Sequence, residues 1–149
     1  MKLGFIGTGK ITSSVIAGIC NSRISFRKIL VSPRNRKVAK KLKRKFRKVF
    51  IAKNNQEIVN SCNWVFLAVT PPVGEKIIKH LKFRSSQTIV SFISTMTLSQ
   101  LKKVIKVKAK IVRAIPLPPI SLRKGPVPVF PKNKKVENFF NKLGTTVEI

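Results

Sequence analysis

The sequence predicts an α/β fold in which helices cover both faces of a doubly wound, mainly parallel β-sheet. Short apolar runs alternate with segments whose apolar residues recur at helical spacing, along the whole chain of 149 residues. The links between these segments are short, as in successive strand–helix–strand crossovers. The run from Trp64 to Val69 is continuously apolar, which is typical of a strand buried on both faces of a parallel sheet.

The first half of the chain is predicted to alternate strands with helices. Strands are expected at residues 2–6, 28–32, 49–51 and 64–69. Helical spacing of apolar side chains predicts one helix carrying Ile11, Val15, Ile16 and Ile19, and a basic helix carrying Val38, Leu42 and Phe46. A short helix is expected at residues 55–60. Strands joined in this way by helices lie parallel.

The second half continues the alternation. Helices are expected at residues 74–81, 98–105 and 136–143, and strands at residues 88–92, 109–115 and 145–149. Residues 116–131 form a proline-rich segment, in which residues 127–129 are predicted as an edge strand. No repeat or flexible linker divides the chain, so residues 1–149 are expected to form a single domain.

The charge balance excludes several kinds of catalytic site. Lys and Arg number 32, against only 4 acidic residues, and the formal net charge is +28. Four scattered carboxylates do not suit a catalytic acid pair or a carboxylate metal site. One histidine, His80, and two cysteines are too few for a zinc site, so no metal is expected. His80 lies beside lysines and is interpreted as a solvated helix residue.

The cysteines and the apolar pattern predict a cytoplasmic protein. Cys20 and Cys62 lie far apart in the sequence, which is typical of reduced thiols rather than of a disulfide scaffold. No apolar run reaches the roughly 18 residues of a membrane span, and the first residues do not resemble a signal peptide. We therefore expect no membrane partner. Apolar residues make up 43% of the chain, which is enough for a packed core.

Gly7 and Gly9 stand where the first strand meets the first helix. In a Rossmann-type dinucleotide fold, the first glycine of the pattern G-x-G-x-x-G permits a tight turn. The second lets the backbone approach the cofactor pyrophosphate at the helix N-terminus. Thr12 occupies the third glycine place, so the pattern is incomplete. Turns also use glycine for structural reasons, but this position between strand and helix favours a cofactor site.

The end of the second strand favours NADP over NAD as the cofactor. NAD sites usually place Asp or Glu there, which binds the ribose 2′-hydroxyl. This chain instead has Ser32, Pro33, Arg34, Asn35 and Arg36. A hydroxyl followed by guanidinium groups suits a 2′-phosphate, which arginine can bind bidentately. Surface arginines also arise without that role in so basic a chain, and NAD stays the alternative.

Several segments together resemble the pyrroline-5-carboxylate reductase family. They are GFIGTGKI at residues 4–11, VFLAVTPP at 65–72, IVSFIS at 89–94, KIVRAIPLPP at 110–119 and the closing LGTTVEI. Related 3-hydroxyacid and F420-dependent oxidoreductases match the RAIP segment less well. The resemblance covers essentially the whole chain. It implies hydride transfer from NAD(P)H to a cyclic imine carboxylate, the step that forms proline in proline biosynthesis.

The resemblance also implies which residues bind the cofactor. The pyrophosphate would contact Gly7, Thr8, Gly9, Lys10 and Ile11. Ser32 and Arg34 would face the adenosine ribose, and Asn55 would contact the adenosine side. The nicotinamide half would lie beside Ala68, Val69, Thr70 and Pro71. These residues follow strand ends on the carboxyl side, where open α/β sheets bind ligands.

The chain departs from the family near the substrate. The family's Met-Pro-Asn-Thr-Pro is IPLPP at residues 115–119, so Leu117 and Pro118 replace polar side chains. The family's Ala-Ala-Gly after the fifth strand is IST at residues 93–95. Leu117 and Pro118 donate no side-chain hydrogen bond, so a different small-molecule substrate is expected. Ser94, Leu117 and Pro118 are the substrate-side candidates, and no catalytic residue is assigned.

The expected function is that of the cofactor domain of an NADP-dependent oxidoreductase. Family members continue into a helical C-terminal domain that forms the dimer and completes the substrate pocket, and this domain is expected to be absent here. A homo-oligomer is left open. One alternative is a dinucleotide-binding domain without catalytic activity, which would bind the cofactor without turnover.

The other alternative is a basic domain that binds nucleic acid or another polyanion. Lys and Arg are dense between residues 34 and 53, and such density favours contacts with a phosphate backbone. The chain has no Tyr and only 1 Trp for base stacking, and it shows no known nucleic-acid motif. Nonspecific polyanion binding in vitro is expected in either case.

Overall fold

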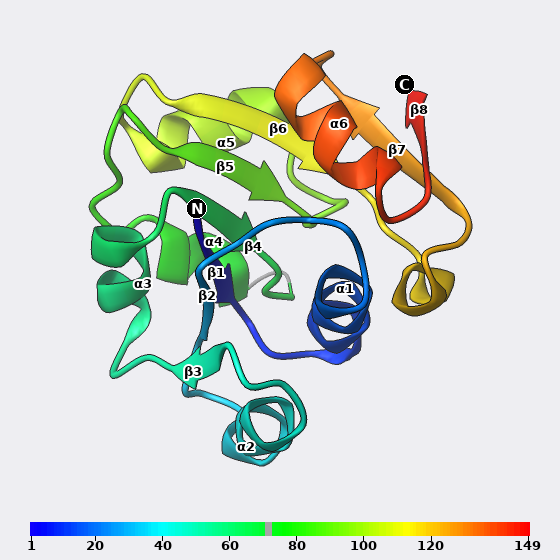
Figure 1. Ribbon diagram of the computed structural model, residues 1–149. Helices are drawn as coiled ribbons and strands as arrows, with labels where there is room; N and C mark the ends of the chain where they lie inside the picture. The colour runs from blue at the N-terminus through cyan, green and yellow to red at the C-terminus, as the bar shows by residue number, and fades with distance from the viewer. Residues whose placement is uncertain (71–72) are drawn as a thin grey trace.

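The computed structural model describes residues 1–70 and 73–149, which form one sheet flanked by helices (Figure 1). The strands are β1 (Lys2–Ile6), β2 (Lys28–Val31), β3 (Val49–Ile51), β4 (Trp64–Leu67), β5 (Thr88–Ser91), β6 (Lys110–Ala114), β7 (Pro126–Phe130) and β8 (Thr145–Glu148). The helices are α1 (Lys10–Cys20), α2 (Arg36–Lys45), α3 (Asn55–Ser61), α4 (Val73–Ile78), α5 (Leu98–Ile105), α6 (Lys134–Asn141) and the 3₁₀-helix η1 (Pro118–Leu122). Within these described ranges, no helix is long and apolar enough to cross a membrane.

The strand order confirms the predicted doubly wound α/β fold. The strands follow each other across the sheet as β3-β2-β1-β4-β5-β6-β7-β8. Neighbouring strands are parallel except for β6 and β7, which are antiparallel. Each predicted strand and helix is present, with ends that differ from the prediction by a few residues.

The predicted edge position of residues 127–129 is wrong, because β7 lies between β6 and β8. The carbonyl oxygens of Gly125 and Val129 accept hydrogen bonds from backbone N–H groups of the last segment. Pro128 directs its backbone toward β6, since its carbonyl oxygen accepts a hydrogen bond from the Ile115 N–H at 2.9 Å, and Pro126 points the same way by the alternation of a strand. The missing N–H groups of the two prolines therefore cost β7 no hydrogen bond to β8.

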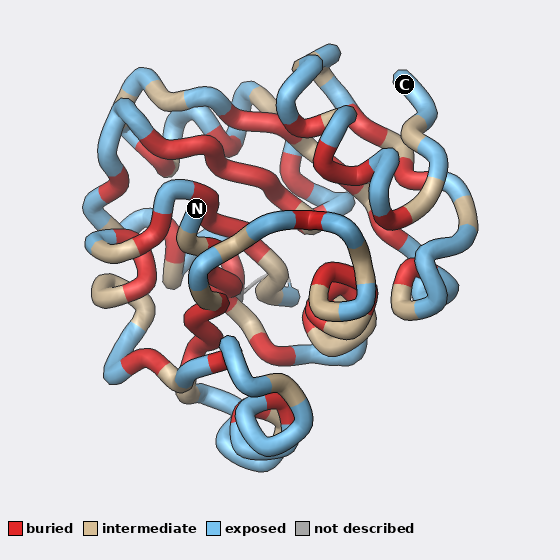
Figure 2. The backbone as a smooth tube through the Cα atoms, viewed as in Figure 1, coloured by how far each residue is buried: buried red, intermediate tan, exposed pale blue. Residues whose placement is uncertain are grey.

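Each face of the sheet has its own hydrophobic core. Helices α1, α2 and α6 supply buried side chains to one core, and α3, α4 and α5 supply them to the other. Alternate strand residues enter opposite cores: Leu3 and Phe5 of β1 enter the first, and Ile6 enters the second. Figure 2 shows burial along the central strands, whereas most of α2 is exposed. Apolar contacts on both faces of the sheet therefore hold the helices against it.

Aromatic side chains hold β1, β4 and α6 together. Phe5 and Phe66 are register partners, and their rings stack with centroids 4.4 Å apart at an interplanar angle of 7°. The ring of Phe139 in α6 lies 4.8 Å from Trp64 and 5.7 Å from Phe66. Phe140 meets Phe66 edge-on. Ring pairs of this kind contribute about 0.5–1.5 kcal/mol each beyond the burial of their area.

The direction of winding changes between β1 and β4. From β1 the sheet first grows to β2 and β3, and the chain then returns to place β4 on the other side of β1. The segment after β1 leads to α1 on one face, and the segment after β4 leads to α4 on the other. In open α/β sheets, ligands bind outside the carboxyl ends of strands at such a switch point. The topology therefore indicates a ligand site beyond β1 and β4.

Gly18 permits a close approach of α1 to η1, and its replacement tests this contact. A Cβ atom at Gly18 would lie 2.5 Å from the carbonyl oxygen of Ile120. We predict that Gly18→Ala lowers the free energy of unfolding by about 1–3 kcal/mol, although alanine has the better helix propensity. Urea unfolding followed by circular dichroism measures this change. Ser14→Ala in the same helix is the control, with a change below about 0.5 kcal/mol, and equal effects of the two variants would contradict the close packing.

Candidate functional site

A cleft of about 490 Å³ lies at the carboxyl ends of β1, β2 and β4. The segments that follow these three strands form most of it, and α3 and α4 contribute one residue each. Its described lining consists of Gly7, Thr8, Gly9, Ser32, Arg34, Asn35, Arg36, Asn55, Ala68, Val69, Thr70 and Ile77. The cleft therefore coincides with the switch point of the sheet.

Gly7 and Gly9 are glycines for different reasons. Gly7 has a φ of +106°, and a Cβ atom there would lie 2.5 Å from the carbonyl oxygen of Ala68. The fold itself thus requires glycine at this position. Gly9 has extended backbone, with φ −88° and ψ −170°, and a Cβ atom there would have no atom within 4 Å. In the described part of the chain nothing crowds Gly9, so the space before α1 is open to a ligand.

The N-terminus of α1 presents hydrogen-bond donors to this space. Gly9 is the N-cap residue and supplies no side-chain cap, and the first turn contains no acidic residue. The first N–H groups of a helix have no intrahelical acceptor, and they carry the positive end of the helix dipole. An anionic group beside Gly9 would accept hydrogen bonds from them. The arrangement therefore suits an anion such as a phosphate group.

Two hydroxyl groups fix the conformation of the turn. The Gly7 N–H donates to Ser32 Oγ at 3.0 Å, and Thr12 Oγ1 donates to the Gly7 carbonyl oxygen at 2.8 Å. Thr12 is fully buried, at 0% exposure. A threonine thus fits the third glycine place because its hydroxyl is bonded to the turn instead of being left unpaired. The incomplete glycine pattern is compatible with the turn that it was expected to form.

Two buried polar atoms of the cleft have no hydrogen-bond partner among the described residues. They are Thr8 Oγ1 and Asn55 Oδ1. Buried polar atoms are nearly always hydrogen-bonded, so each of these is available to a polar group of a bound ligand. Thr8 belongs to the turn before α1, and Asn55 begins α3. Both atoms fit a polar ligand that extends across the cleft.

The β2 side of the cleft is positively charged. Arg34 and Arg36 are exposed, and both line the cleft. Asn35 between them caps α2 by accepting a hydrogen bond from the Val38 N–H at 3.4 Å. A second hollow, of about 430 Å³, adjoins this side and includes Arg34, Arg36 and Lys53. No acidic side chain lines the described part of either hollow, so this end of the site suits an anion.

The structure brings most of the expected cofactor residues into one cleft. Those that line it are Gly7, Thr8, Gly9, Ser32, Arg34, Asn55, Ala68, Val69 and Thr70. Lys10 and Ile11 form the start of α1 and are not part of the described lining. Pro71 lies outside the described residues. Ser32 is almost fully buried and its oxygen is bonded to Gly7, so its contribution is to hold the turn.

The substrate-side candidates lie outside the described lining of the cleft. Ser94 follows β5 and is exposed, and its carbonyl oxygen accepts a hydrogen bond from Arg113 Nη2 at 2.9 Å. Leu117 and Pro118 follow β6, and Leu117 is 44% exposed. The three residues share the carboxyl edge of the sheet with the cleft because β5 and β6 run parallel to β4.

Asn35 and Ile77 line the cleft without having been expected there, and Arg36 was expected only as one of the guanidinium groups after the second strand. Asn35 and Arg36 follow Arg34 directly, so their place after the second strand was a usable signal. Ile77 belongs to the apolar residues of α4, and its sequence pattern indicates only helix packing.

The described cleft supplies binding groups rather than catalytic groups. Its lining contains no His, Lys, Cys or carboxylate, and arginine is the only ionisable residue type described there. Burial raises the pKa of both Cys20 and Cys62 to about 11, so these thiols stay protonated at neutral pH, and neither lines the cleft. The arrangement therefore suits a ligand that brings its own reactive group.

Comparison with known sequences identifies relatives of the chain. The model of a family described as "NADP oxidoreductase coenzyme F420-dependent" matches residues 2–97. Pyrroline-5-carboxylate reductase 3 of Danio rerio is 27% identical over 128 residues, covering 84% of this chain and 44% of the relative. The resemblance to pyrroline-5-carboxylate reductases is thereby confirmed. The chain spans about half the length of the relatives it matches.

Solved structures share the fold. 1-Pyrroline-5-carboxylate reductase from Streptococcus pyogenes gives a TM-score of 0.84 at 21% identity, covering 100% of this chain and 58% of that one. Pyrroline carboxylate reductase of Plasmodium falciparum, solved with NADP bound, gives 0.84 at 23% identity, covering 100% and 57%. The expected Rossmann-type fold is thus confirmed. Because the family model matches most of the chain, including the glycine turn and the strand ends at the cleft, the chain belongs to the NADP oxidoreductase, coenzyme F420-dependent, family.

Proposed function

We propose that the chain binds NADP in the cleft and acts as the cofactor domain of an oxidoreductase. The observation that carries this proposal is the open space at Gly9, before the uncapped N-terminus of α1. It is supported by Thr8 Oγ1 and Asn55 Oδ1 in the same cleft, which have no hydrogen-bond partner among the residues that the structure describes. The bound cofactor would supply hydride chemistry, and the chain would supply its binding and orientation.

The residues of the cleft fit the parts of a dinucleotide in order. The backbone of Gly7, Thr8 and Gly9, with the start of α1 at Lys10 and Ile11, would bind the pyrophosphate. Ser32 and Arg34 would lie at the adenosine ribose and Asn55 on the adenosine side, and Ala68, Val69, Thr70 and Pro71 would border the nicotinamide half. The relative from Plasmodium falciparum, whose structure contains NADP, supports this choice of ligand.

NADP is favoured over NAD by the charge at the β2 side of the cleft. Arg34 and Arg36 line it, and the described lining contains no carboxylate that would accept a hydrogen bond from a ribose 2′-hydroxyl. A guanidinium group binds a phosphate through charge-assisted hydrogen bonds. NAD would lose these contacts and would bind more weakly.

The proposed reaction is hydride transfer to an imine or a related small molecule. It is supported by the similarity to pyrroline-5-carboxylate reductase 3 of Danio rerio. Leu117 is exposed and, like Pro118, donates no side-chain hydrogen bond, which favours a substrate different from pyrroline-5-carboxylate.

Leu117 and Leu122 are 44% and 67% exposed, so a homo-oligomer that covers them is part of the proposal.

Residues 1–149 are proposed to act as a single dinucleotide-binding domain in the cytoplasm. The two cores share one continuous sheet, which supports a single domain. Both cysteines are free thiols, as is usual in a reducing compartment.

The two alternatives differ from the proposal in measurable ways. A dinucleotide-binding domain without catalytic activity would bind NADPH but would not oxidise it with any cyclic imine. A polyanion-binding domain would bind nucleic acid at α2, whose exposed residues are all Lys or Arg, and would show no saturable NADPH binding. Titration with NADPH, followed by its fluorescence, tests the proposal, and absence of saturable binding would refute it.

Replacement of Gly9 should affect cofactor binding, whereas replacement of Gly7 should affect the stability of the fold. We expect Gly9→Ala to weaken NADPH binding at least tenfold, because its methyl group enters the proposed pyrophosphate space, while the free energy of unfolding changes by less than about 1 kcal/mol. Gly7→Ala should lower the free energy of unfolding by about 1–3 kcal/mol. NADPH titration and urea unfolding measure the two effects. Unchanged NADPH binding by Gly9→Ala would contradict the placement of the pyrophosphate.

Arg34 is predicted to distinguish the two cofactors. Arg34→Gln should raise the Kd for NADPH about tenfold or more, because a hydrogen bond to a charged group contributes about 1.5–3 kcal/mol, and should change the Kd for NADH less than about twofold. Calorimetric titration at 0.15 M salt measures both constants. Arg23→Gln, an exposed arginine outside the cleft, is the matched control. Equal weakening of both cofactors by Arg34→Gln would refute the assignment of Arg34 to the 2′-phosphate.

A further inference from the structure

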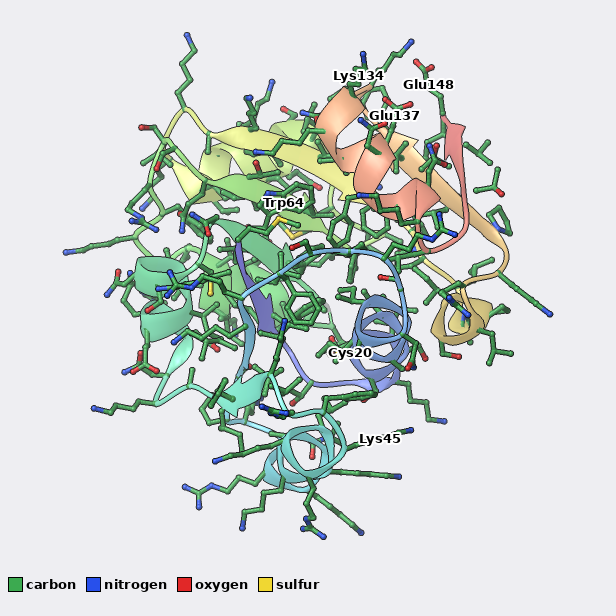
Figure 3. The ribbon with its side chains drawn as sticks, viewed as in Figure 1. Cys20, Lys45, Trp64, Lys134, Glu137 and Glu148 are labelled. Carbon is green, nitrogen blue, oxygen red and sulfur yellow. The ribbon has the colours of Figure 1, made fainter. Side chains whose placement is uncertain are left out.

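The basic residues between residues 34 and 53 lie on helix α2 and on the segments that flank it. We call this feature the α2 surface. Its exposed members are Arg34, Arg36, Lys37, Lys40, Lys41, Lys43, Arg44, Lys45, Arg47, Lys48 and Lys53. Figure 3 shows long basic side chains extending from α2 into solvent in several directions, with Lys45 labelled among them. No acidic residue interrupts the sequence between residues 34 and 53.

The apolar side of α2 is used for packing and leaves the charged side free. Ala39 and Leu42 are buried in the first core, and Val38 is packed against it. Every exposed residue between Arg36 and Lys45 is Lys or Arg. A helix that inserts into a membrane surface needs an exposed apolar face, and α2 has none. The α2 surface therefore suits a hydrated polyanion rather than a bilayer.

The dimensions of α2 suit a nucleic-acid backbone. A helix of 10 residues is about 15 Å long. A duplex strand carries one phosphate per about 3.4 Å along its axis, so this length faces about four phosphates of one strand. The exposed side chains of α2 include no aromatic residue that would stack on a base. The contacts offered are therefore those of a phosphate backbone without base recognition.

The α2 surface extends into the cofactor cleft. Arg34 and Arg36 line the cleft itself, and both also line the adjoining hollow together with Lys53. The first turn of α2 contains no acidic residue, so the positive end of its helix dipole adds to these charges. The same two guanidinium groups are thus available to an anion in the cleft and to an anion on α2.

We propose that the α2 surface docks the phosphodiester backbone of a nucleic-acid duplex, and that duplex and NADP weaken each other's binding because both use Arg34 and Arg36. The second half of this statement rests on the proposed function of the cleft. By linkage, the factor by which NADP weakens duplex binding equals the factor by which the duplex weakens NADP binding.

A first experiment locates the duplex without using the cofactor. The probe is a fluorescent 24-base-pair DNA, and its anisotropy gives the Kd over a series of salt concentrations. In the full chain, the triple variant Lys40→Gln/Lys43→Gln/Arg44→Gln removes three exposed charges of α2 that lie outside the described cleft lining. The slope of log K against log salt should fall by about three.

The matched control removes the same charge from the opposite side of the sheet. It is Lys102→Gln/Lys103→Gln/Lys108→Gln, which changes three exposed residues on and after α5. We expect its salt slope to change by less than one. An equal change in both triple variants would refute docking at α2, since it would indicate attraction by net charge alone. Binding of polyglutamate as tight as that of the DNA at equal salt would refute the assignment to phosphodiesters.

A second experiment tests the coupling. At 0.1 M salt, saturating NADPH should raise the Kd of the DNA about tenfold or more, because two phosphate contacts are lost. NADH at equal occupancy should raise it less, because NADH has no 2′-phosphate to occupy the two arginines. Saturable NADPH binding without a shift of the DNA curve would refute the coupling and leave the proposed function standing. Equal shifts with the two cofactors would refute the role of Arg34 and Arg36.

The two proposals fail in distinguishable ways. If NADPH shows no saturable binding, the proposed function fails and the coupling fails with it. The comparison of the two triple variants still decides the docking at α2, because it uses DNA alone.

Discussion

The contact between the glycine turn and the end of β4 is the constraint on which the site depends. Without a Cβ atom at Gly7, the turn approaches the Ala68 carbonyl oxygen closely, and the Ala68 N–H donates to the Ile6 carbonyl oxygen at 2.8 Å. Ser32 and Thr12 bond the N–H and the carbonyl of Gly7, so the turn is held from two further directions. The turn is thereby fixed by β1, β2, β4 and α1 together. The carbonyl oxygen of Gly9 accepts a hydrogen bond from the Ser13 N–H at 3.1 Å, and a Cβ atom at Gly9 would have no described atom within 4 Å, so Gly9 leaves the cleft open.

The sequence allowed the fold to be predicted because apolar periodicity reports local geometry. It also placed Gly7 and Arg34 in the cleft, because parallel strands bring their carboxyl ends to one edge. The role of Thr12 was not predictable in this way, since it depends on a hydrogen bond across a turn whose conformation the sequence does not encode locally. The prediction that β7 is an edge strand failed for a related reason. Proline is tolerated inside a sheet when its nitrogen needs no hydrogen-bond partner, and the sequence does not show which strands lie on either side of β7.

The positive charge leaves the fold intact because it lies outside both cores. The buried residues of the two cores are apolar, and the few buried polar residues are uncharged. Repulsion among exposed lysines and arginines lowers the stability of the compact state but acts outside both cores. At 0.15 M salt the screening length is about 8 Å, so each cation interacts mainly with its nearest neighbours. Local density, as on α2, therefore matters more than the net charge of the chain.

The cleft combines two physical means of binding an anion, and these respond differently to salt. Beside Gly9 the donors are backbone N–H groups of a rigid turn, so recognition there rests on geometry and on a dipole at short range. At Arg34 and Arg36 the donors are exposed cations, whose attraction is screened by salt. Affinity for the part common to NAD and NADP should thus fall less with added salt than the preference for the 2′-phosphate. The selectivity for NADP over NAD and the affinity for the part common to both cofactors are therefore separable properties of one cleft. Only the selectivity depends on residues shared with the α2 surface.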